Sequence, residues 1–160
     1  MKNTLLKKKY KLLLINPVNQ YRKGIYNSKE ASVPPLGLGI IASLTPDHWD
    51  IEILDENFDS FDKRVADLVG FTALTSQVTR AYDLAYFYRE KNIPTVLGGI
   101  HASMLPDEAS QYVDIVVKGE AESVWHEVIK DFENGTQKRF YEGSLLPMDK
   151  SPSARYDLFS

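Results

Sequence analysis

Short apolar runs, which are typical of strands buried in a sheet, alternate along this chain with segments whose apolar residues recur three and four positions apart. The second pattern is typical of helices that bury one face. The strand-like segments are Lys11–Asn16, Asp50–Asp55, Asp67–Leu74, Pro94–Gly98 and Asp114–Lys118. The helix-like segments are residues 36–44, a shorter stretch at 58–68, residues 78–88, a segment starting at Pro106, and residues 124–132.

Strands that alternate with helices predict an α/β fold, because right-handed crossovers then produce a parallel sheet covered on both faces. We expect a flavodoxin-like (Rossmann-like), doubly wound, five-stranded sheet in three α/β/α layers, with strand order 2-1-3-4-5. The second segment alternates polar and apolar residues, which favours an edge position. Lys138–Tyr141 is a candidate for one more short edge strand. The pattern predicts a domain over residues 1–143 and a linker or tail over residues 144–160.

Composition narrows the function classes. The chain has 160 residues, 43% hydrophobic residues and a net charge of −3, so no overall positive field attracts nucleic acid. The early apolar run Leu12–Ile15 is far shorter than the ~20 residues of a membrane span. No cysteine is present, which excludes disulfides, thiolate zinc sites and iron–sulfur clusters held by this sequence. We expect a cytoplasmic domain with neither nucleic acid nor a membrane as its partner.

Two familiar motifs fail on their context. Residues 37–42, GLGIIA, match a dinucleotide-binding fingerprint, but its glycines must lead directly from a strand into a helix. Here the first strand ends near Asn16, so we expect these glycines to let a helix pack closely against a neighbour. His126 and Glu127 begin a zinc-protease pattern, but Lys130 stands where the second histidine ligand would be.

The third, fourth and fifth strands end in small or polar residues. Glycines at a strand end permit positive φ angles and close approach of a ligand to the backbone, although a tight turn would also explain them. Because the carboxyl ends of parallel strands meet at one edge, these residues predict a wide, hydrogen-bonding rim that suits a large ligand. His101 would either touch that ligand or bond to the backbone. The residues are Thr72, Thr75, Ser76, Gly98, Gly99, Gly119 and Glu120.

Several stretches together resemble a known family. They are LLLINP at 12–17, PPLGLGIIAS at 34–43, DIEILDEN at 50–57, DLVGFTALTSQVTRAYDLA at 67–85, VLGGIHASMLPDEA at 96–109 and DIVVKGEAESVW at 114–125. The chain resembles the N-terminal cobalamin (B12)-binding domain of cobalamin-dependent radical SAM enzymes. Subgroups with this pattern include enzymes similar to the anaerobic magnesium-protoporphyrin IX monomethyl ester cyclase.

The resemblance implies that cobalamin lies across the strand ends, with the corrin on the rim and the nucleotide tail entering the sheet edge. Many cobalamin domains carry D-x-H-x-x-G after the first strand, whose histidine is the lower cobalt ligand. The corresponding segment here is Asn16–Tyr21, which has no histidine, so the resemblance implies cobalamin without a protein lower ligand. The implied cofactor-binding residues are Thr72, Leu74, Thr75, Ser76, Gly98, Gly99, Ile100, His101, Gly119 and Glu120.

The resemblance also implies a partner. Radical SAM chemistry needs a C-x-x-x-C-x-x-C motif for a 4Fe–4S cluster and S-adenosylmethionine, and this sequence has no cysteine. We therefore expect a radical SAM domain beyond residue 160 of a longer protein, and a chain that presents the corrin without being catalytic itself. Two alternatives remain open from the residues: a cofactor-free docking domain of the same fold, and another small-ligand-binding α/β domain.

Overall fold

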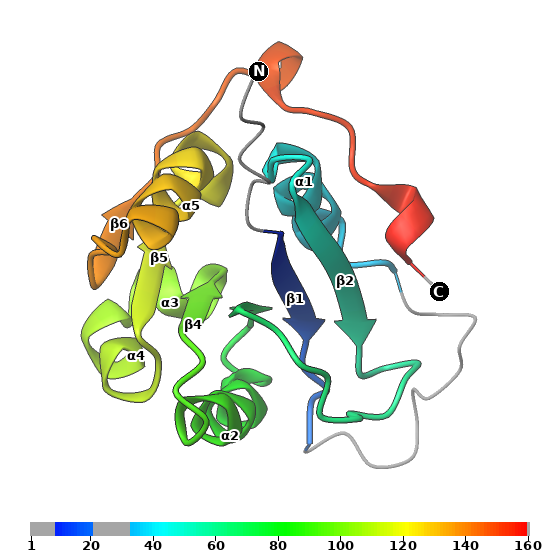
Figure 1. Cartoon of the computed structure of the whole chain (residues 1–160), viewed down its shortest axis with the longest axis vertical. Coiled ribbons are helices and arrows are strands. Elements are labelled where there is room, and N and C mark those ends of the chain that lie inside the picture. Colours follow the sequence, from blue (N-terminus) through cyan, green and yellow to red (C-terminus); the bar gives the residue numbers. More distant parts are fainter. Residues whose placement is uncertain (1–8, 21–32, 160) are drawn as a thin grey trace, which may run out of the picture.

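One parallel sheet forms the centre of the computed structural model, which describes residues 9–20 and 33–159 (Figure 1). The strand order is β2-β1-β3-β4-β5-β6. The strands are β1 Tyr10–Asn16, β2 Trp49–Asp55, β3 Leu68–Thr72, β4 Thr95–Gly98, β5 Ile115–Lys118 and β6 Phe140–Glu142. The flavodoxin-like order of the first five strands is confirmed. The expected total of five is wrong, because β6 adds a sixth strand that pairs in parallel with β5.

Helices cover both faces of the sheet. They are α1 Leu36–Leu44, α2 Val78–Arg89, α3 Ile100–Met104, α4 Pro106–Tyr112 and α5 Trp125–Asn134, with short 3-10 turns η1 Ala121–Ser123, η2 Met148–Lys150 and η3 Tyr156–Leu158. Residues of α2, α3 and α4 share one hydrophobic core with the sheet, and residues of α1 and α5 share the other. The three-layer arrangement therefore follows from the two sets of apolar stripes.

The helix expected at residues 58–68 is wrong, because the chain between β2 and β3 forms turns, bends and irregular backbone. Lys63 adopts a φ of 60°, which a right-handed helix cannot contain. Phe61 still packs against the core beside Phe87, whereas Val65 is 76% exposed. The position of Phe61 in this stretch therefore indicated a buried side chain but not a helical backbone.

The register of the sheet places side chains that matter for the site. Gly70 pairs with Val96, and Thr72 pairs with Gly98. Because successive side chains point to opposite faces, positions 70, 96 and 98 all face α1 and α5. Leu14 faces the same way from β1 and lies in the same core as Val96.

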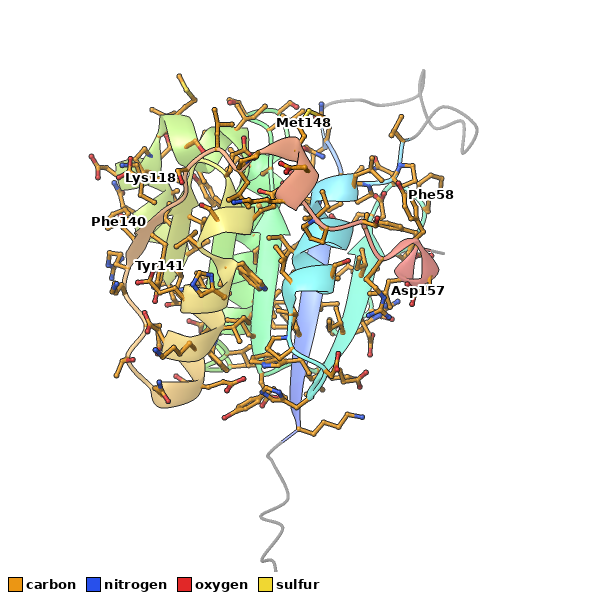
Figure 2. All side chains as sticks on the ribbon, turned by 90° about the horizontal axis from the view of Figure 1, so that it is seen from above. Phe58, Lys118, Phe140, Tyr141, Met148 and Asp157 are labelled. Carbon is orange, nitrogen blue, oxygen red and sulfur yellow. The ribbon has the colours of Figure 1, made fainter. Side chains whose placement is uncertain are left out.

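Residues 144–159 return across the layer formed by α5 and α1. Figure 2 shows this segment passing from Phe140 and Tyr141 at one side to Asp157 at the other. The backbone N–H of Arg155 donates to the carbonyl of Gly39 at 3.0 Å. A Cβ on Gly39 would lie 2.9 Å from the Cβ of Ala154, so this glycine does let α1 pack closely, and its neighbour is the tail. The predicted boundary at residue 143 stays a prediction.

Within the described residues, no helix is both long enough and apolar enough to cross a membrane.

Candidate cofactor site

A pocket of about 170 Å³ lies between the sheet and the α1–α5 layer, at the carboxyl ends of the central strands. Leu14, Gly70 and Val96 contribute to its lining from three neighbouring strands. Helix α1 contributes Gly37, Leu38 and Ile41, and the η1–α5 side contributes Ala121, Glu122 and Trp125. Thr72, Gly98, Gly99, Gly119 and Glu120 line it where the strands end.

Three of the residues that line this space are glycines without a Cβ. A Cβ built on Gly98 of β4 or on Gly37 of α1 would meet no atom within 4 Å. A Cβ on Gly70 of β3 would meet only the end of the Leu14 side chain, at 2.9 Å. A pocket of about 150 Å³ admits a benzene ring, whereas whole drug-sized ligands need about 300 Å³ or more. The pocket therefore suits one ring of a larger ligand whose remainder lies outside.

Two other glycines join the strand ends to one another. Gly99 has φ 94° and ψ −173°, and its Cβ would approach the Thr72 hydroxyl oxygen to 2.9 Å. Gly119 has φ 69°, and its Cβ would collide with the carbonyl oxygen of Gly143. The Ser103 hydroxyl donates to the Gly99 carbonyl at 3.0 Å and accepts from the Gly119 N–H at 2.9 Å. These glycines thus hold the rim together beside the pocket.

The structure brings together five of the ten residues implied by the resemblance, since Thr72, Gly98, Gly99, Gly119 and Glu120 all line the pocket. Four others, Leu74, Thr75, Ser76 and Ile100, are exposed at the same edge of the sheet. The Gly98 carbonyl accepts from the N–H of Ala73, whose own carbonyl accepts from His101, so these two strand ends adjoin. Whether each residue binds cofactor stays a prediction.

The tenth residue, His101, lies beneath the rim and is 2% exposed. Its Nδ1 is 3.1 Å from the Thr75 hydroxyl oxygen, and its Nε2 is 3.1 Å from a carboxylate oxygen of Glu108 on α4. The ring therefore bonds two side chains, whereas the residue's own N–H donates to the Ala73 carbonyl and its carbonyl accepts from the Leu105 N–H. The imidazole lies outside the pocket lining, and contact with a ligand on the rim stays a prediction.

Sequence reasoning missed Gly37, Gly70 and Trp125. A glycine in the middle of a strand marks close approach of another group, and that signal was present at Gly70. Gly37 belongs to the GLGIIA motif, which was set aside because no strand leads directly into its glycines. The indole N–H of Trp125 donates to the Thr45 hydroxyl at 2.9 Å in the buried core, which fixes one wall of the pocket.

The charges at the pocket favour hydrogen-bond donors over anions. Glu120 and Glu122 line it, and among residues 9–20 and 33–159 no lysine, arginine or histidine does. Lys118 lies at the neighbouring strand end and pairs with Glu142 at 3.5 Å. In the part of the chain that the structure describes, no three histidine, aspartate or glutamate side chains are grouped to hold a metal ion.

Fold and site together define a parallel α/β domain with a pocket between its sheet and the α1–α5 layer, of a size that suits one ring of a large ligand. The family model for the B12 binding domain matches residues 22–129, and the chain belongs to this family. The resemblance to a B12-binding domain is thereby confirmed. Residues 21–32, which include the start of the match, lie outside the described residues.

Among the relatives are two methyltransferases of Chlorobaculum tepidum. Bacteriochlorophyllide d C-8(2)-methyltransferase is 37% identical over 119 residues, 72% of this chain and 26% of that protein. Bacteriochlorophyllide d C-12(1)-methyltransferase is 34% identical over 146 residues, 89% of this chain and 32% of that protein. Hopanoid C-2 methylase of Rhodopseudomonas palustris is 30% identical over 91 residues, 55% of this chain and 17% of that protein. The chain thus spans a third or less of each relative.

Proposed function

We propose that this chain binds cobalamin, with the nucleotide base in the pocket and the corrin across the rim. The observation that carries the proposal is the cradle left by Gly37, Gly70 and Gly98, which a Cβ at Gly37 or Gly98 would begin to fill. Membership of the B12-binding family supports cobalamin as the ligand. When bound, cobalamin supplies a cobalt centre able to carry a methyl group.

The residues of this chain would bind, orient and shield the cofactor. The apolar side chains of Leu38, Ile41 and Trp125 offer a dry wall for a planar ring. Leu74 and Ile100 are 49% and 62% exposed at the rim, where they offer apolar surface to one face of the corrin. Because Glu120 accepts hydrogen bonds, it suits the N–H or O–H groups that surround a corrin and its nucleotide.

We propose that the cobalt receives no ligand from this protein. Among the described histidines, the ring of His101 is buried and bonded to Thr75 and Glu108, and His48 is bonded to Glu133. His126 is exposed at the start of α5 and lies outside the pocket lining. The Asn16–Tyr21 segment contains no histidine, although Tyr21 lies outside the described residues.

In the longer protein, we propose a cytoplasmic radical SAM methyltransferase in which this domain presents the corrin to a catalytic domain. Two of these relatives are named as methyltransferases and one as a methylase, which supports a methyl-carrying role over the cyclase suggested by the resemblance. Since this sequence contains no cysteine, the 4Fe–4S cluster and S-adenosylmethionine would be held outside it.

Titration with hydroxocobalamin tests the proposal. We expect the purified chain to retain the red cofactor through a desalting column, with a stoichiometric endpoint in the corrin absorption band. Cobinamide, which lacks the nucleotide, is the matched probe. Loss of one buried aromatic ring is worth about 1.5–3 kcal/mol, so cobinamide should bind about 10- to 150-fold more weakly.

Two outcomes would contradict the proposal. If hydroxocobalamin is lost on desalting at micromolar concentration, the cofactor-free docking domain becomes the better description. If cobinamide binds as tightly as hydroxocobalamin, the pocket does not hold the nucleotide base.

A further inference from the structure

A hydrogen-bonded chain of four polar side chains leads from Tyr82 in the core, through the exposed Glu108 and the buried His101, to Thr75 at the rim. The Tyr82 hydroxyl of α2 donates to a carboxylate oxygen of Glu108 at 3.0 Å, and the Nε2 of His101 lies 3.1 Å from the same oxygen. The His101 Nδ1 lies 3.1 Å from the Thr75 hydroxyl oxygen. Tyr82 stacks on Tyr112 with ring centroids 4.0 Å apart, which fixes the inner end of the chain.

The partners determine where the protons lie. An ionised carboxylate only accepts hydrogen bonds, so Nε2 of His101 carries a hydrogen and donates it to Glu108. In the neutral form of the imidazole only one nitrogen carries a hydrogen, so Nδ1 is then an acceptor. In that form, Thr75 donates its hydroxyl hydrogen inward to Nδ1. Among the described residues, His101 is the hydrogen-bond partner that the structure gives to the Thr75 side chain.

With the imidazole neutral, the Thr75 hydroxyl therefore turns its hydrogen inward and presents only its oxygen lone pairs to solvent. It is exposed at the carboxyl edge, three residues after Thr72, which lines the pocket. A hydroxyl that is free to rotate serves as donor or acceptor, whereas this one is held as an acceptor toward any ligand on the rim.

We propose that His101, as a neutral imidazole, is a positioning residue that makes the Thr75 hydroxyl an acceptor, so that this part of the rim selects a ligand group with N–H donors. On the proposed function, on which this inference rests, that group is a primary carboxamide at the edge of the corrin. A carboxylate at the same place has no hydrogen to donate to Thr75. Two hydrogen-bond acceptors would then face each other, which weakens binding.

The test measures affinities for hydroxocobalamin and for its monocarboxylic derivatives, in each of which one primary carboxamide is hydrolysed to a carboxylate. With the wild-type chain, we expect at least one derivative to bind about 5-fold or more weakly than hydroxocobalamin, the effect of one hydrogen bond of ~1 kcal/mol. Thr75→Val should bring that ratio close to one, because the acceptor is absent.

Two variants at position 101 separate positioning from packing. In His101→Asn the side-chain oxygen takes the place of Nδ1 and still accepts from Thr75, so the ratio should persist. In His101→Gln the amide nitrogen takes the place of Nε2 and keeps the bond to Glu108, but Thr75 is released to donate to a carboxylate and the ratio should fall. A merely structural role would weaken binding of every derivative equally and leave the ratio unchanged in both variants.

The outcomes distinguish this inference from the proposed function. If hydroxocobalamin binds tightly but the wild-type chain does not discriminate against any derivative, the inference is overturned and the proposed function stands. If hydroxocobalamin does not bind, both are overturned. Should the position 101 variants fail to fold, Thr75→Val decides alone, because Thr75 is exposed; an unchanged ratio in that variant overturns the inference.

Discussion

Replacing Gly98 with alanine should strengthen the fold and weaken cobalamin binding. Gly98 ends β4 without a positive φ angle, and its Cβ would meet no atom within 4 Å. Alanine at such a position reduces the freedom of the unfolded chain and stabilises a protein by about 0.4–1 kcal/mol. The new methyl group would project into the pocket of about 170 Å³.

The same methyl group would occupy space that we assign to the nucleotide base. One surplus methyl in a well-packed site costs about 1–3 kcal/mol, which corresponds to hydroxocobalamin affinity about 5- to 150-fold lower. Cobinamide does not enter the pocket on this proposal, so its affinity should remain that of the wild type. Urea unfolding of the cofactor-free chain and absorbance titration give the two quantities.

Gly99→Ala is the matched control, one residue along the chain. Its backbone, at φ 94° and ψ −173°, lies in a region that is essentially restricted to glycine, at a cost of about 1–3 kcal/mol for other residues. Its Cβ would also press on Thr72 and Ala73. We therefore expect this variant to lose stability, in contrast to Gly98→Ala. If Gly98→Ala binds hydroxocobalamin as the wild type does, or is destabilised like Gly99→Ala, the assignment of the pocket is wrong.

Three further predictions concern the packing around the site. Gly39→Leu should displace the tail and lower the free energy of unfolding by about 1–3 kcal/mol. Limited proteolysis should then show faster tryptic cleavage after Arg155, and cleavage at the wild-type rate would contradict the prediction. Thr45→Val should cost about 1–3 kcal/mol in urea unfolding by leaving the indole N–H of Trp125 unpaired, whereas Thr45→Ser should not; equal losses would refute this reason. Burial raises the pKa of Tyr141 from 10.0 to about 12, so its contribution to stability is complete below pH 10 and declines as the pH rises toward about 12. This alkaline decline in the free energy of unfolding should be smaller in Tyr141→Phe, and an identical decline would contradict the assignment.

The main architecture was predictable from local pattern. The continuous run Leu12–Ile15 predicted a strand buried on both faces, and β1 lies inside the sheet with those residues buried. The alternating pattern at Asp50–Asp55 predicted an edge strand, and β2 is at the edge. Both patterns depend directly on which faces of a strand are covered, so the predictions made from them agree with the observed strand positions.

The errors in the fold arise where burial and backbone shape differ. Phe61 is partly buried, but the positive φ of Lys63 prevents the helix that the aromatic spacing suggested. The last strand has only three residues, Phe140–Glu142, and its pairing with β5 depends on a neighbour that the local pattern does not identify. Short elements of this kind are specified by tertiary contacts more than by their own sequence.

The site was predictable in part, for a similar reason. The rule that parallel strands end at one edge was sufficient to group Gly98 with Gly119. The pocket also needs Gly70 beside Gly98 and Gly37 opposite, which depends on strand register and on where α1 packs. The bonds of His101 depend on the α4 position of Glu108, which the sequence does not locate.

The cradle formed by Gly37, Gly70 and Gly98 also affects how such domains evolve. Glycine and alanine codons differ by a single base, so at Gly37 or Gly98 the cavity can begin to fill in one mutational step without a clash. In a lineage deprived of its cofactor, packing at these two positions would not oppose that drift. Descendants of this architecture that have become docking elements should therefore carry methyl-bearing residues at these two places.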